Sequence, residues 1–153
     1  MKKWSVYLIG LSLTLFTSTT LLSQEWSDSQ KEVWETVNTY VNMFDKGDVQ
    51  GLLSYFDESF SGWSYSLEAP HDKNSIKKMM NYWSTNNKVI YLTLTPAKIW
   101  VEGDYAYVHY YYTSLSEDKE GKKKWKKGRY TDILLKKDGK WMLVGDHGGA
   151  ISK

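Results

Sequence analysis

The sequence predicts an α+β domain in which N-terminal helices pack on a strongly curved antiparallel sheet. Two observations carry this prediction. Apolar residues recur at helical spacing up to about Asn87, and from Lys88 onward they alternate as in strands. Asp138-Gly139 then marks a tight hairpin, because both residues tolerate the positive φ of a type I′ turn. Helices followed by successive antiparallel strands are typical of the α+β class.

Residues 1–23 are expected to be a signal peptide that directs export. Met1-Lys2-Lys3 gives a positive start, the stretch from Ser5 to Leu22 carries no charge, and Ser23 suits the position before the cut. An uncleaved membrane anchor is the alternative, which the Ser and Thr content of the stretch disfavours. We therefore expect a secreted or periplasmic protein, with residues 24–153 as a single domain and no membrane contact after cleavage.

The composition argues against a nucleic acid partner and excludes disulfide bonds. The net charge of +2, from 20 basic and 18 acidic residues, is too small to indicate a nucleic acid partner. The chain has no cysteine, so packing alone must hold the fold. Eight Trp and twelve Tyr supply large apolar areas for that packing.

Helical periodicity predicts three helices. The first runs from about Ser29 to Lys46, because Ser29 and Glu32 have the spacing of a capping box. A short second helix follows Asp48, and a third begins near Asn74 or Ser75. The buried face of the first helix is expected to carry Val33, Trp34, Val37, Tyr40, Val41 and Phe44.

Strand periodicity accounts for most of the remaining chain. An extended segment is expected over 57–65, followed by a loop over 66–73 that leaves His71 in solvent. Four antiparallel strands are then expected, over 89–101 with an interruption at Pro96, over 105–115, over 129–137 and over 140–147. The basic run 122–127 is interpreted as a solvated hairpin tip.

The strand over 105–115 has two apolar faces, whereas a sheet with one face in water should have one polar face. One face carries Ala106, Val108, Tyr110 and Tyr112, and the other carries Tyr105, Tyr107, His109 and Tyr111. The second stripe predicts a homodimer through the outer face of the sheet. The alternative is a single chain in which these tyrosines are partly exposed.

The C-terminal half contains motifs of a known family. The segment Val101-Glu102-Gly103-Asp104-Tyr105-Ala106-Tyr107-Val108 resembles the Gly-Asp-x-Ala-x-Val motif of SnoaL-like proteins in the nuclear transport factor 2-like superfamily. Together with Asp138-Gly139-Lys140-Trp141 and His147, it is similar to the association domain of calcium/calmodulin-dependent protein kinase II. The resemblance implies a cone-shaped fold with a pocket, and these turn and core motifs specify fold better than chemistry.

The resemblance also bears on the chemistry of the pocket. It places Tyr112 and Asp132 where the kinase association domain has arginines, which implies a neutral or acidic pocket here. Tyr40 takes the position of the helix-one tyrosine of ketosteroid isomerase, an enzyme that uses an Asp base. The segment 62–65, where that base would fall, contains no carboxylate, so a steroid isomerase mechanism is not expected.

Asp132 is the leading candidate for chemistry, because an acid within a strand-forming run is costly to bury without a partner. His147 on the neighbouring strand is the proposed partner, and the two could act as a general base. Alternatively, Asp132 faces solvent and His147 merely caps the edge of the sheet. Aromatic residues that could line a ligand pocket are Tyr40, Trp63, Tyr65, Tyr110 and Tyr112.

These features favour a protein that binds a small apolar molecule and lacks a complete catalytic set. The alternatives are a lyase, isomerase or hydrolase acting on an apolar or polyketide-like substrate through Asp132 and His147, and a structural dimerisation module. The three histidines lack metal-ligand spacing, and no phosphate-binding glycine loop is present, so neither a metal nor a cofactor is expected.

Overall fold

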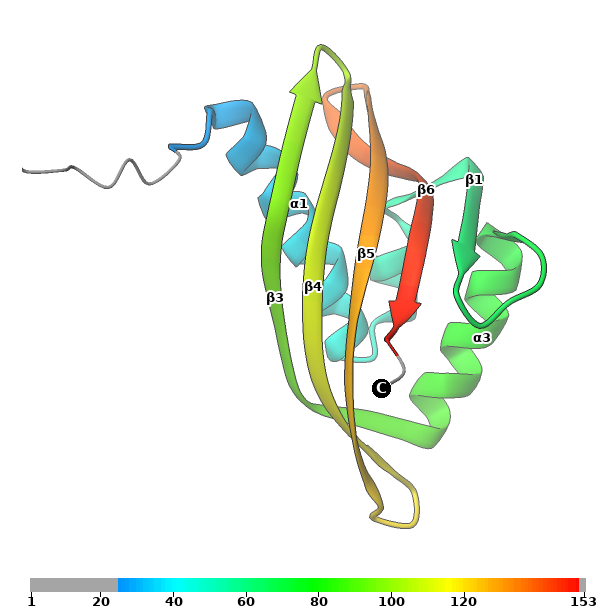
Figure 1. Ribbon diagram of the computed structural model, residues 1–153. Helices are drawn as coiled ribbons and strands as arrows, with labels where there is room; N and C mark the ends of the chain where they lie inside the picture. Colours follow the sequence, from blue (N-terminus) through cyan, green and yellow to red (C-terminus); the bar gives the residue numbers. More distant parts are fainter. Residues whose placement is uncertain (1–24, 152–153) are drawn as a thin grey trace, which may run out of the picture.

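The computed structural model describes residues 25–151, which form helices and a sheet (Figure 1). The helices are α1 (Asp28–Asp45), α2 (Val49–Leu53) and α3 (Lys73–Asn86). The strands are β1 (Phe56–Ser64), β2 (His71–Asp72), β3 (Asn87–Glu102), β4 (Tyr105–Asp118), β5 (Lys123–Lys137) and β6 (Lys140–Ala150). The expected signal peptide lies outside the described residues. Within them, no helix has the length and apolarity needed to cross a membrane.

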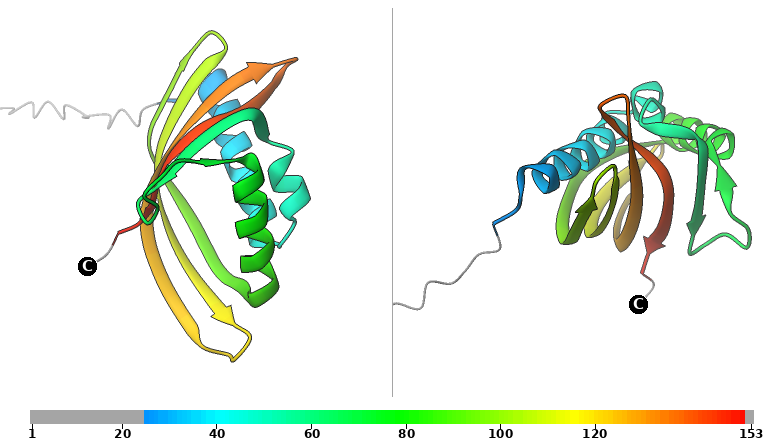
Figure 2. Two further views of the ribbon diagram at one scale, coloured as in Figure 1. Left: turned by 90° about the vertical axis from the view of Figure 1, so that its right-hand side faces the viewer. Right: turned by 90° about the horizontal axis from the view of Figure 1, so that it is seen from above.

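The described strands form one six-stranded sheet in the order β2-β1-β6-β5-β4-β3. The sheet bends strongly, and the helices lie on its concave side (Figure 2). The predicted α+β class and the antiparallel pairing of β3 to β6 are confirmed. One pair differs, because β1 runs parallel to β6. Most of the domain separates these two strands in sequence, so no short turn forces them to be antiparallel.

Two helix starts differ from the expected ones. The capping box of α1 is formed by Ser27 and Gln30, whose reciprocal hydrogen bonds measure 3.2 and 2.9 Å. Glu32 is thereby free to pair with Lys136 of β5 at 2.8 Å, which ties α1 to the sheet. Helix α3 begins at Lys73 because Asp72 caps it, accepting a hydrogen bond of 2.7 Å from the Ser75 N–H.

Strand β3 continues through Pro96, where an interruption was expected. It lies at the edge of the sheet, where a residue without an N–H group is tolerated. A register shift between Pro96 and Lys98 absorbs the irregularity. The hairpin between β5 and β6 forms as predicted, with φ values of 51° at Asp138 and 77° at Gly139.

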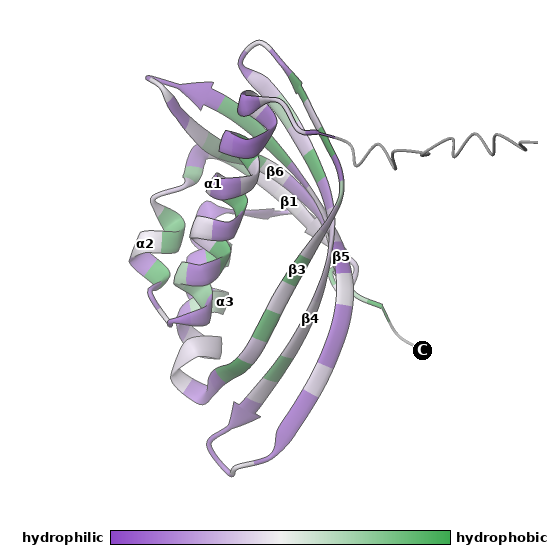
Figure 3. Ribbon diagram, turned by 90° about the vertical axis from the view of Figure 1, so that its left-hand side faces the viewer, coloured by the Kyte–Doolittle hydropathy of each residue, from purple (hydrophilic) through white to green (hydrophobic). Residues whose placement is uncertain are grey.

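The core lies between the concave face of the sheet and the helices. Val33 and Val37 of α1, Val108 of β4 and Leu134 of β5 have no exposed surface. Apolar and polar residues alternate along the strands (Figure 3), which leaves the opposite, convex face to solvent. The basic run 122–127 lies on the β4–β5 hairpin, which projects beyond the helices (Figure 1).

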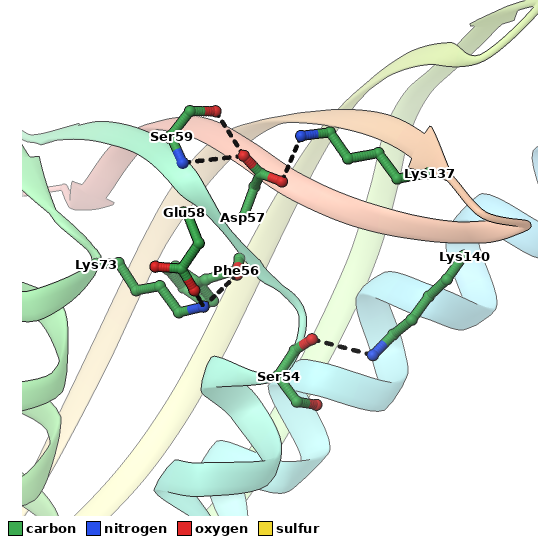
Figure 4. A network of polar contacts seen from close by, with 8 residues as sticks. All are labelled: Ser54, Phe56, Asp57, Glu58, Ser59, Lys73, Lys137 and Lys140. Carbon is green, nitrogen blue, oxygen red and sulfur yellow. Dashed lines mark hydrogen bonds and ion pairs between the residues drawn. The ribbon is translucent and has the colours of Figure 1, made fainter.

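Polar contacts fix β1 against its neighbours (Figure 4). The buried carboxylate of Asp57 accepts hydrogen bonds from Ser59 and from Lys137, the latter at 2.6 Å. The bond from Lys137, followed by those from Ser59, holds the pKa of Asp57 well below its usual value. Lys73 of α3 donates to the Phe56 carbonyl at 2.7 Å. These contacts hold one wall of the concave face in place.

Candidate functional site

A cavity of about 290 Å³ lies between the concave face of the sheet and the helices. Its walls are apolar over most of their area, as is usual for sites that bind small molecules. The helices contribute Val41, Phe44, Ile76, Met79, Met80 and Trp83, and β3 contributes Val89, Leu92 and Leu94. Phe44 and Trp83 pack with ring centroids 4.8 Å apart. This wall accepts apolar groups.

Asp132 lies at the polar end of the cavity, which we call the floor. The floor also contains Tyr40, Tyr110, His71 and Asp146. Only 2% of the Asp132 surface is exposed. The hydroxyl groups of Tyr40 and Tyr110 both donate hydrogen bonds to its Oδ2 atom, the latter at 3.1 Å. The carboxyl group therefore links α1 to β4 and β5 at the floor of the cavity.

The pKa of Asp132 is raised to about 7, because burial disfavours its charged form and the nearby Asp146 carboxylate adds repulsion. The hydrogen bonds from Tyr40 and Tyr110 oppose this rise. Burial raises the pKa of both tyrosines well above the usual value, with the Asp132 charge as the next cause. Both phenols thus remain protonated donors.

Asp146 and His71 complete the floor. The His71 Nε2 atom lies 3.7 Å from the Asp146 Oδ1 atom. Neither ring nitrogen of His71 nor Asp146 Oδ1 has a hydrogen-bond partner within the described residues. Burial raises the pKa of Asp146, and the His71 charge opposes that rise. The floor thus contains buried polar atoms that have no hydrogen-bond partner among the described residues.

Gly62 of β1 makes room for this pair. A Cβ atom at Gly62 would lie 2.2 Å from Asp146 Oδ1 and 2.7 Å from His71 Nε2. The distances are shorter than any normal contact, so a side chain here would displace the pair. The glycine is therefore required by the close approach of β2 and β6 to the backbone of β1.

The predicted Asp132–His147 pair is wrong, because a bulge in β6 reverses which residues face the cavity. Leu134 of β5 pairs with Leu143, whereas the preceding Ile133 pairs with Gly145. The extra residue turns Asp146 towards Asp132 and places His147 opposite Thr131. His147 therefore lies on the convex face.

On the convex face, His147 packs edge-on against Tyr65, with ring centroids 5.1 Å apart. His147 also borders a shallow hollow with Tyr65, His109 and Arg129. The Arg129 Nε atom donates to the Tyr65 hydroxyl at 3.0 Å. The alternative prediction that Asp132 faces solvent is also wrong, because Asp132 is buried.

The predicted ligand-binding residues divide between the two faces. Tyr40, Tyr110 and Tyr112 line the cavity. Trp63 and Tyr65 do not, and 48% and 44% of their surfaces are exposed. Trp63 pairs with His147 across the parallel strands, so it shares the outward orientation of that residue. The prediction that Trp63 and Tyr65 line the pocket is therefore wrong, because their side chains lie outside the cavity.

The sequence prediction missed His71 and Asp146. His71 was expected in solvent, yet it is 8% exposed because residues 71–72 form β2 beside β1. Asp146 has the same sequence signal as Asp132, an acid in an otherwise apolar strand. The prediction instead chose the neighbouring His147 as the partner of Asp132. In the described part of the chain, no group of three or more His, Asp or Glu residues is arranged to hold a metal ion.

A bent sheet around a cavity, with helices across its open side, defines the cone-shaped fold of the nuclear transport factor 2-like superfamily. Residues 29–152 match the model of the calcium/calmodulin dependent protein kinase II association domain. The chain belongs to this family. None of the curated proteins matches the chain.

Solved structures support the same fold. A ketosteroid isomerase-like protein from Erwinia carotovora atroseptica has a TM-score of 0.72 and 12% identity, over 84% of this chain and 100% of that one. A candidate association domain from Xanthomonas campestris has a TM-score of 0.64 and 21% identity, over 80% and 88%. A nuclear transport factor 2-like protein from Rhodospirillum rubrum has a TM-score of 0.67 and 18% identity, over 78% and 98%. Such identities show the fold alone.

The raised pKa of Asp132 gives a testable pH dependence. The pKa is about 7 in the folded protein against a usual 3.8, so the folded state binds this proton more tightly than the unfolded state. The associated stability is present at low pH and is lost as the pH rises through about 7. Between pH 4 and 8, the free energy of unfolding of the wild type should therefore fall by roughly 4 kcal/mol relative to Asp132→Asn.

Urea unfolding of both proteins across this range measures the difference. Asp138→Asn in the exposed hairpin turn is the matched control, and its curve should follow the wild type. If the Asp132→Asn curve runs parallel to the wild type, Asp132 does not titrate in this way.

Proposed function

We propose that the protein binds a small, mostly apolar molecule that carries one polar group. One observation supports the proposal above others: an apolar cavity ends in a floor where His71 and Asp146 keep unpartnered polar atoms. Buried polar atoms without partners are costly, so a ligand that completes their hydrogen bonds gains affinity. Its apolar part would lie against Phe44, Trp83 and Leu94.

A cavity-filling substitution tests this proposal. N-phenyl-1-naphthylamine, a neutral dye that fluoresces in apolar surroundings, should bind to the purified protein. Leu94→Trp should weaken its binding by about tenfold or more, since the larger side chain occupies the space that the dye needs. Leu67→Trp, at a position 39% exposed and outside the cavity, is the control and should bind as the wild type does. Equal dye binding by both variants would contradict the assignment to the cavity.

A second candidate function is proton transfer on a bound substrate, favoured by the pair of His71 and Asp146. Asp146 would orient the imidazole, which would accept a proton from a carbon next to a carbonyl group. The protonated form of Asp132, held in place by the hydroxyls of Tyr40 and Tyr110, would donate a hydrogen bond to the resulting oxyanion. The ketosteroid isomerase-like protein shares the fold. The pair of His71 and Asp146 would take the place of the Asp base that ketosteroid isomerase uses.

Hydrogen exchange tests this candidate without knowledge of the natural substrate. The protein in D₂O should accelerate deuterium incorporation next to the carbonyl of α-tetralone, followed by NMR. His71→Gln should remove the acceleration and retain dye binding, because it removes the base and keeps the volume of the side chain. Exchange at the rate of the buffer alone would exclude this activity for the ketone.

The convex face supports a proposal about assembly, namely a homodimer through the sheet. The family model describes an association domain. Tyr107 stacks on Trp100, with ring centroids 5.4 Å apart and an interplanar angle of 15°. Large apolar side chains surround this pair and are 47% to 63% exposed: Tyr105, Tyr111 and Ile133. An exposed apolar area of this kind is typical of an interface between protein chains.

A charge at the centre of this face should separate the subunits. Tyr107→Glu should give a folded monomer, because an unpaired carboxylate is costly to bury in an apolar interface. Tyr82→Glu on α3, at a position 75% exposed, is the control and should remain dimeric. Light scattering after size exclusion measures the mass. A monomeric wild type at high micromolar concentration would rule out the dimer.

A further inference from the structure

We infer that the ligand's polar group is a protonated amine, so that the cavity takes an organic cation with an apolar body. This inference rests on the proposed function and specifies its ligand class. It is carried by the floor, where carboxylate oxygens of Asp132 and Asp146 and the imidazole of His71 come together at the end of an aromatic cavity.

The floor is rich in hydrogen-bond acceptors. Asp146 Oδ1 has no hydrogen-bond partner among the described residues. A neutral imidazole at His71 has one N–H donor, which faces Asp146 when it is on Nε2, 3.7 Å away, and it then leaves Nδ1 as an acceptor. The hydroxyls of Tyr40 and Tyr110 are already committed as donors to Asp132. A ligand that must satisfy these atoms therefore has to supply donors, and an ammonium group supplies up to three on one atom. A ligand carboxylate would supply none.

No permanent cation of the described chain neutralises the floor. Lys126 lines the cavity, but it stands six residues from Asp132 along β5, so their Cα atoms are up to about 20 Å apart along the strand. Lys136 and Lys137 bind Glu32 and Asp57 on other surfaces. Arg129 borders the hollow on the convex face. The negative charge of the floor is therefore available to a ligand.

Aromatic rings surround the same end of the cavity. Tyr130 lies between Tyr110 and Tyr112, with ring centroids 6.0 and 5.8 Å from theirs. Their electron-rich faces attract a cation within about 6 Å, and this attraction strengthens when water is excluded. The rings and the carboxylates both attract a positive charge, so together they favour a cationic ligand over a neutral one.

Protons link this binding to pH. The groups that face Asp132 are Tyr40 from α1, Tyr110 from β4, Tyr130 from β5 itself, and Asp146 from β6 with His71 of β2 beyond it. Burial keeps the tyrosines protonated, so the proton that a ligand can displace is the one on Asp132, whose pKa is raised by burial and by the nearby Asp146. An ammonium ligand favours the ionised carboxylate and displaces this proton. Its affinity should therefore rise as the pH increases.

Three ligands with the same aromatic body provide the experiment: 2-phenylethylamine as the cation, 2-phenylethanol as the neutral form and 3-phenylpropanoate as the anion. Calorimetry at pH 8 should give the amine the tightest binding and the anion the weakest. From pH 6 to pH 8, amine affinity should rise by about tenfold as a group with a pKa of about 7 ionises, while affinity for the alcohol stays constant.

Asp146→Asn should weaken amine binding by about tenfold or more, the loss of one charge-assisted hydrogen bond, and leave alcohol binding nearly unchanged. Asp138→Asn removes a charge of the same sign in the hairpin turn and should change neither. Binding of the alcohol as tight as that of the amine, or tighter binding of the anion, would overturn the inference and leave the proposed function intact. If the naphthylamine dye and all three ligands fail to bind, both the proposed function and this inference fall.

Discussion

The buried carboxyl group of Asp132 is the constraint around which this domain is organised. It stands at the centre of the concave face, where Tyr40 of α1 and Tyr110 of β4 both donate hydrogen bonds to one of its oxygens. Removing a carboxylate from water costs several kcal/mol, and these bonds recover part of that cost. The same contact links α1 to the sheet at the floor of the cavity.

A single extra residue in β6 determines the rest of the floor. Without the bulge at residues 144–145, strict alternation would direct Gly145 and His147 into the cavity and Asp146 away from it. With the bulge, two carboxyl groups face each other across β5 and β6, and their repulsion adds to the rise in the pKa of Asp132. Gly62 then allows His71 to approach from β2. The polar floor is thus a product of backbone geometry.

The two faces of the sheet serve different roles in this interpretation. The concave face is closed by helices and encloses the cavity, whereas the convex face presents stacked Trp100 and Tyr107 to solvent. An alternating strand separates these roles, since neighbouring residues such as Tyr110 and Tyr111 point to opposite sides. A ligand and a second subunit could therefore be bound at once, because neither needs the surface of the other.

The sequence by itself determined the α+β class, three helices, the four antiparallel strands and the Asp138-Gly139 turn, because these depend on local periodicity and turn chemistry. Asp132, Tyr40, Tyr110 and Tyr112, which the sequence singled out by residue type, do line the cavity. Only the tertiary structure decided the partner of Asp132, the burial of His71 and the parallel pairing of β1 with β6. A bulge shifts strand parity without a distinct local pattern, and the approach of residues 62, 71 and 146 joins segments distant in sequence. Such contacts depend on the complete fold.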